Sequence, residues 1–171
     1  FSRRKTTQTI QDYLIEESLV GISDVDTRAI VRHIRSKGAM NCIISSETTD
    51  IDVLTAKLNE VPDMNGLELA SRVSTTTPYY IGNSDAEKKV IVYDFGVKKS
   101  ILENIAIRGC YLKVVPAKTK FEDTLDFKAD GYFISNGPGD PASMGYAVET
   151  VKQILQNDKP LFGICLGQQL L

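Results

Sequence analysis

Leu161-Phe162-Gly163-Ile164-Cys165-Leu166-Gly167 is the stretch of sequence that decides the fold. Its first residues are apolar and predict a short buried strand, which delivers a cysteine onto a turn flanked by glycines. A strand-to-helix corner of this kind is typical of a nucleophile elbow, which exposes the nucleophile and leaves backbone N–H groups free nearby. The helix N-terminus that follows favours the thiolate, the reactive form of cysteine. We therefore expect Cys165 to be a covalent nucleophile.

The residues that lead up to this stretch alternate between short apolar runs and amphipathic helical patterns. Strands are predicted at 90–93, 111–115, 131–135 and 161–164, and helices are predicted before Gly109 and over 145–156. Continuous apolar strands that alternate with helices predict a parallel sheet covered on both faces. In such sheets the functional loops lie at the carboxyl ends of the strands. Residues 88–171 are thus predicted to form an α/β domain.

The first part of the chain has a different pattern. Residues 1–75 are predicted to form a smaller α+β region, with helices beginning at Ile10, covering 26–35 and covering 52–58, and with one strand at 39–44. Asp26 is the expected N-cap of the second helix, and Gly38 is expected at its end. Residues 76–87 contain Pro78, Gly82 and Asn83, and predict a linker between the two regions.

Composition excludes several classes of protein. The 171 residues are 42% hydrophobic and 25% charged with a net charge of −2, which is typical of a soluble globular protein and gives no reason to expect nucleic acid or a membrane as partner. The three cysteines have no metal-ligand spacing, so we expect neither a metal site nor a disulfide framework. Cys42 and Cys110 are expected to be small core residues in a chain from a reducing cytoplasm.

A second unusual loop, Asn136-Gly137-Pro138-Gly139-Asp140-Pro141, follows the predicted strand at 131–135. By itself such a segment is most simply a turn that reverses the chain. Its pairing with the elbow on a neighbouring parallel strand favours a site instead, because the backbone at Gly137 and Gly139 can approach a ligand closely. The Leu166 amide is expected to stabilise an oxyanion, and Gln168 or Gln169 to hydrogen-bond an amide substrate.

A cysteine nucleophile of this type needs a base, which is normally histidine. The only histidine, His33, lies on the predicted helix at 26–35 and is interpreted as a surface or boundary residue. We therefore expect the base to lie outside this chain, and we expect the isolated 171-residue piece to be inactive.

Several of these segments resemble a known family. The elbow, read as Gly163 to Gln169, and the loop at 136–141 are similar to class I, triad-type glutamine amidotransferase domains. Tyr93-Asp94-Phe95-Gly96-Val97-Lys98, Gly21-Ile22-Ser23-Asp24-Val25-Asp26-Thr27-Arg28 and Lys37-Gly38-Ala39-Met40 resemble the small, glutamine-hydrolysing subunits of carbamoyl-phosphate synthetases. The resemblance runs over almost the whole chain. It implies a truncated parallel-sheet amidotransferase domain, preceded by part of a smaller α+β N-terminal domain.

The resemblance also implies roles for particular residues. Cys165 takes the place of the nucleophile, and the glutamine-contacting or oxyanion positions fall on Gly137, Gly139, Leu166 and Gln169. Gln168 stands where the family often has histidine. The family's catalytic histidine and acid come from a C-terminal segment, so we expect the chain to lack both ends of the subunit.

The implied chemistry is glutamine hydrolysis through a cysteine thioester. Ammonia passes to a large subunit, which makes carbamoyl phosphate from bicarbonate and ATP for pyrimidine and arginine biosynthesis. ATP and Mg are expected on that large subunit, with no cofactor in this chain, and the complex is expected to be a cytoplasmic heterodimer. Two alternatives remain open: an amidotransferase of another pathway, such as anthranilate or guanylate synthesis, and a non-catalytic assembly module. The N-terminal 75 residues argue against the first.

Overall fold

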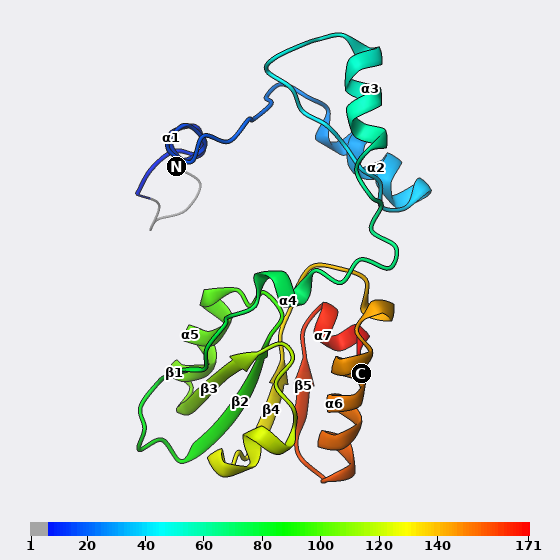
Figure 1. The fold of residues 1–171 in the computed structure, drawn as a ribbon. Coiled ribbons are helices and arrows are strands. Elements are labelled where there is room, and N and C mark those ends of the chain that lie inside the picture. The colour runs from blue at the N-terminus through cyan, green and yellow to red at the C-terminus, as the bar shows by residue number, and fades with distance from the viewer. Residues whose placement is uncertain (1–6) are drawn as a thin grey trace. The chain divides into compact units, whose positions relative to one another are not determined.

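The computed structural model describes residues 7–171 and divides the chain after Met64 into two compact units. The second unit, residues 65–171, contains a five-stranded sheet (Figure 1). Its strands are β1 (Tyr79–Ile81), β2 (Lys88–Asp94), β3 (Cys110–Pro116), β4 (Gly131–Ile134) and β5 (Leu161–Gly163), in the order β1-β3-β2-β4-β5. All neighbouring pairs are parallel except β1 with β3, which is antiparallel. The predicted α/β fold with a parallel sheet is confirmed.

Helices and short 3₁₀ segments connect these strands. They are α4 (Ala70–Val73), α5 (Lys99–Ile107), η1 (Glu122–Phe127), η2 (Pro141–Ser143), α6 (Gly145–Gln156) and α7 (Leu166–Gln169). The period-2 alternation of each strand divides the core between the two sheet faces. Ile91 and Tyr93 pack with α6 and α7 on one face, whereas Val92 packs with Leu102 of α5 on the other. The helices therefore cover the sheet from both sides, as the sequence predicts.

The first unit contains three helices, α1 (Ile10–Glu16), α2 (Thr27–Lys37) and α3 (Ile51–Asn59). Asp26 caps α2 as predicted, because its carboxylate accepts a hydrogen bond from the Ala29 N–H at 2.9 Å. Gly38 ends α2 with a φ of 89°. None of the three helices contains a buried residue.

Two predictions for the first unit are wrong. Residues 39–44 form no strand, because a strand exists only by pairing and no second strand is present among described residues 7–64 to pair with them. Cys42 is exposed for the same reason, since the predicted strand was to carry its side chain into a core. Cys110 at the start of β3 is partly buried and packs against the core on the α5 face.

The sequence also leaves some elements of the second unit unpredicted. β1 lies inside the segment predicted as a linker, and pairs Tyr80 with Lys113. Its three residues are flanked by proline and glycine, so the pattern is too short to show a strand period. No helix among residues 7–171 is long and apolar enough to cross a membrane.

Candidate active site

The predicted elbow is present at Cys165. The residue lies between β5 and α7 with φ 54° and ψ −114°, which is a strained backbone conformation for a residue other than glycine. The Ile164 N–H donates to the Ile134 carbonyl at 3.1 Å, and the Gly167 N–H donates back to the Ile164 carbonyl at 3.0 Å. These two bonds close the corner around Cys165 and leave its side chain exposed. The local structure is that of a strand-to-helix turn that presents a thiol.

Gly167 brings the elbow against the neighbouring strand. A Cβ atom at this position would lie 2.2 Å from the Ile134 carbonyl oxygen and 2.9 Å from that of Ser135. Only glycine allows so close an approach, and α7 therefore begins directly on the carboxyl end of β4. The loop at 136–141 starts at the same place, so the structure brings together the starts of the two segments that the sequence singled out.

The backbone after Cys165 provides hydrogen-bond donors. Among the described residues, the Leu166 N–H donates to no protein acceptor, whereas the Gln169 N–H is taken by the Cys165 carbonyl at 3.0 Å. The Leu166 side chain is 2% exposed and anchors the turn in the core, and the side chains of Gln168 and Gln169 are exposed. A free amide beside the thiol is what an oxyanion requires.

The first half of the 136–141 loop is joined to the loop that follows β2. Ser135 Oγ accepts a hydrogen bond from the Phe95 N–H at 2.9 Å. The Asn136 amide donates to the Gly96 carbonyl at 2.9 Å and accepts from the Lys98 N–H at 3.2 Å. A Cβ on Gly137 would lie 2.0 Å from the Phe95 carbonyl oxygen. The close approach for which Gly137 is needed is therefore an approach to this chain's own backbone.

Asp94, at the end of β2, organises that partner loop. Its Oδ1 accepts hydrogen bonds from the N–H groups of Gly96 and Val97 at 2.9 and 2.8 Å, and its Oδ2 accepts one from the Thr75 N–H at 2.7 Å. In the sequence, Asp94 belongs to a segment that resembles the family, and no role is predicted for it. An aspartate at the end of an apolar strand, two residues before a glycine, indicates an Asx-turn. This pattern is the signal in the sequence that identifies Asp94 as an organising residue.

Gly139 holds the second half of the loop. Its φ of 107° suits glycine alone, and a Cβ there would lie 2.9 Å from the Leu67 carbonyl oxygen and 3.0 Å from the Leu69 nitrogen. The loop thus lies between residues 94–98 at its start and residues 67–69 at its end. Sequence patterns gave no sign of the second contact, because its two segments are about seventy residues apart.

His33 lies on α2 in the first unit and is exposed, as predicted for a surface residue. Among residues 7–171, no three His, Cys, Asp or Glu side chains gather as a metal site would require. The second unit therefore provides a thiol and backbone N–H donors. Residues 65–171, which form this unit, contain no histidine.

Comparison with known proteins agrees with this geometry. Residues 91–171, which include both loops and the elbow, match the model of the family described as glutamine amidotransferase class-I. Residues 1–44 match a second model, described as the carbamoyl-phosphate synthase small chain, CPSase domain.

Curated relatives extend the similarity to the whole chain. The carbamoyl phosphate synthase small chain of Chlorobaculum tepidum is 40% identical over all of this chain and 47% of its own length. The small chains of Escherichia coli K12 and Vibrio cholerae are each 41% identical over 99% of this chain and 49% of their own lengths. The chain thus spans about half the length of the curated relatives it matches. The amidotransferase residues and the N-terminal residues match the same relatives, as the sequence resemblance implies.

Proposed function

We propose that this chain is part of the glutamine-hydrolysing small subunit of a carbamoyl phosphate synthase, with Cys165 as the nucleophile. The observation that carries the proposal is the strained elbow, which presents an exposed thiol beside the free Leu166 amide within a class-I amidotransferase sequence. The N-terminal match to the small-chain domain supports this subunit over an amidotransferase of another pathway.

The chemistry follows from these groups. The Cys165 thiolate attacks the side-chain amide carbon of glutamine, and the oxygen of the tetrahedral intermediate accepts a hydrogen bond from the Leu166 N–H. The carbon–nitrogen bond breaks, the nitrogen takes a proton and leaves as ammonia, and a γ-glutamyl thioester remains. Water then attacks the thioester, and glutamate leaves as the thiol is restored. A general base handles the protons, and it is proposed to come from outside the described residues.

The partners belong to the same proposal. Ammonia is delivered to a large subunit, where ATP and Mg are used to make carbamoyl phosphate in the cytoplasm for pyrimidine and arginine synthesis. Gly137, Gly139 and Gln169 are proposed to contact glutamine through the loop and the start of α7. The exposed Gln169 side chain supports this placement.

Labelling with a chloroketone analogue of glutamine tests the chemistry. We expect one adduct, on Cys165, whose formation is suppressed by glutamine. Cys165→Ala should abolish the adduct and lower glutamine-dependent turnover in the complex by at least about a thousandfold, while synthesis from added ammonia continues. Cys42→Ala is the matched control, since Cys42 is also an exposed thiol, and should label normally. An adduct on any other residue contradicts the proposal.

The non-catalytic alternative predicts a different outcome. An assembly module would bind the large subunit and leave the chloroketone unreacted at Cys165 in the assembled complex. Turnover by residues 1–171 alone at the rate of the complex would in turn contradict our expectation that the base lies elsewhere.

A further inference from the structure

Residues 66–71 are hydrogen-bonded to the second half of the loop at 136–141. The Asp140 N–H donates to the Leu67 carbonyl at 2.9 Å. The Asp140 carboxylate accepts hydrogen bonds from the Gly66 N–H at 2.8 Å and the Ala142 N–H at 2.9 Å. One aspartate thus joins its own loop to a segment about seventy residues earlier.

The same segment is tied to α6. Glu68 Oε1 accepts a hydrogen bond from the Tyr146 hydroxyl at 2.9 Å, and the two Glu68 oxygens also accept from the Ser71 N–H and hydroxyl. The Tyr146 ring meets the Phe95 ring edge-on at 6.4 Å. Ala70 is completely buried and fixes this segment to the core. Segment 66–71 is therefore anchored on both sides of the contact with Gly139.

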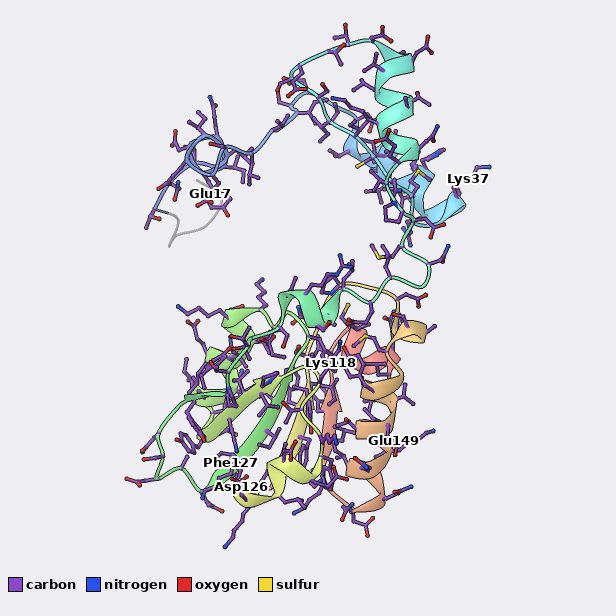
Figure 2. The ribbon with its side chains drawn as sticks, in the orientation of Figure 1. Glu17, Lys37, Lys118, Asp126, Phe127 and Glu149 are labelled. Carbon is purple, nitrogen blue, oxygen red and sulfur yellow. The ribbon has the colours of Figure 1, made fainter. Side chains whose placement is uncertain are left out.

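Both carboxylates are held in the charged form. Burial raises the pKa of Glu68, but hydrogen bonds from Ser71 and Tyr146 and the positive charge of Lys118 outweigh it, and the net effect lowers that pKa. Lys118 follows the carboxyl end of β3 (Figure 2). Its Nζ lies 5.5 Å from the centre of the Tyr146 ring. The backbone donors of Gly66 and Ala142 lower the pKa of Asp140. We call Asp140, Glu68 and Tyr146, together with the segment 66–71 that they hold, the clamp. At neutral pH the clamp is thus held by charge-assisted hydrogen bonds.

We propose that Asp140 is a positioning residue for glutamine recognition. Glu68 and Tyr146 support it, and together they fix the position of the backbone from Gly137 to Gly139. This inference rests on the proposed function of the loop. The clamp contacts Gly139 and Asp140 in the second half of the loop, whereas the backbone of residues 94–98 contacts the first half. Among the described residues, the clamp makes no hydrogen bond to Cys165 or Leu166. Its loss therefore acts on substrate binding and spares the covalent step.

Steady-state kinetics of the full chain, assembled with the large subunit, tests whether loss of the clamp changes KM and leaves kcat unchanged. Asp140→Ala removes both acceptors and should raise KM for glutamine about tenfold to a hundredfold, because the loss of hydrogen bonds to a charged group has effects of this size. Asp140→Asn keeps one acceptor and should have a smaller effect. We expect kcat to stay within about twofold. A fall in kcat with KM unchanged, or no change in either, overturns the proposal.

Milder variants keep the proposal testable if Asp140→Ala does not fold. Tyr146→Phe and Glu68→Gln each weaken the support of the clamp and should raise KM by less than Asp140→Ala, again with kcat preserved. Asp85→Ala and Glu149→Gln are the controls. Both side chains are exposed in the second unit, and Glu149 lies on α6 (Figure 2) about one turn after Tyr146 in sequence. Neither change should alter KM. Unchanged KM in Tyr146→Phe and Glu68→Gln together contradicts the role of the clamp.

Alkylation of Cys165 by iodoacetamide separates this inference from the proposed function. In the wild-type complex, glutamine should protect the thiol, and Asp140→Ala should need about tenfold more glutamine for the same protection. If glutamine does not protect the wild-type thiol, the proposed function fails and this inference falls with it. If it protects wild type and Asp140→Ala at equal concentrations, the positioning role alone is wrong.

Discussion

Gly167 has the tightest constraint of the residues that build the elbow itself. In Gly167→Ala the new Cβ would lie 2.2 Å from the Ile134 carbonyl oxygen, which belongs to the backbone and has no freedom to turn away. We expect a loss of about 1–3 kcal/mol in the free energy of unfolding, the usual cost of overpacking, and displacement of α7 from the end of β4. Urea unfolding followed by circular dichroism measures the loss.

Gly145→Ala is the control for that substitution. Gly145 is the first residue of α6, and a Cβ there meets nothing within 4 Å. Replacement should leave the unfolding free energy unchanged or raise it by about 0.4–1 kcal/mol, since alanine restricts the unfolded chain. Gly167→Ala with the stability of wild type would show that the elbow is not seated on β4.

At the scale of residues, the sequence predicts what is local and misses what is distant. Cys165 and its turn follow from seven consecutive residues, and the structure confirms that corner. The bonds of Ser135 and Asn136 to residues 95 and 96 join positions forty apart, and the bond of Asp140 to Gly66 spans seventy-four. A single sequence has no pattern for such pairs, because neither residue of a pair marks the other when it is taken alone.

The next scale is the element, and α5 shows how burial divides a helix. Leu102 is 2% exposed and packs against β2 and β3, whereas Ile107 on the same helix is 83% exposed. We expect Leu102→Ala to lower the free energy of unfolding by about 2–5 kcal/mol through lost burial and the cavity it leaves. Ile107→Ala should stay within about 0.5 kcal/mol of wild type. Thermal and urea unfolding of the two variants compare them directly, and equal losses would contradict the packing of α5.

The sequence predicts strands where they are long, apolar and paired in parallel, as β2 and β3 are. The run at 39–44 has a similar composition and forms no strand, because strand structure depends on a partner that composition does not report. β1 is the converse case. Tyr79-Tyr80-Ile81 has almost no pattern of its own, and is a strand because β3 offers it an edge.

At the scale of the whole molecule, the two units differ in how they bury apolar side chains. Every residue of both core clusters lies in the second unit, from Ala70 onward, and the helices of the first unit bury none. The sequence pattern changes near residue 75, but the contacts divide the chain after Met64. Residues 66–71 account for the difference, since they pack into the sheet unit through long-range contacts.

Acid should weaken the second unit through the carboxylates of that joining segment. The pKa values of Asp140 and Glu68 are lowered in the folded chain, so protonation favours the unfolded state. Their contribution to stability is full above the ordinary carboxyl pKa of about 4 and is lost as the pH falls through the lower folded values. Asp140→Asn should therefore be less stable than wild type at neutral pH. The difference should shrink as the pH falls below about 4, where first the unfolded and then the folded wild-type chain takes up a proton on Asp140. Urea midpoints of both proteins at a series of pH values measure this difference, and the contributions of all other carboxylates cancel from it.

Asp85→Asn is the control. Asp85 is exposed and takes no part in the clamp, so this variant should have the stability of wild type at every pH. A difference between wild type and Asp140→Asn that is constant with pH would show that the Asp140 charge does not hold residues 66–71 to the loop.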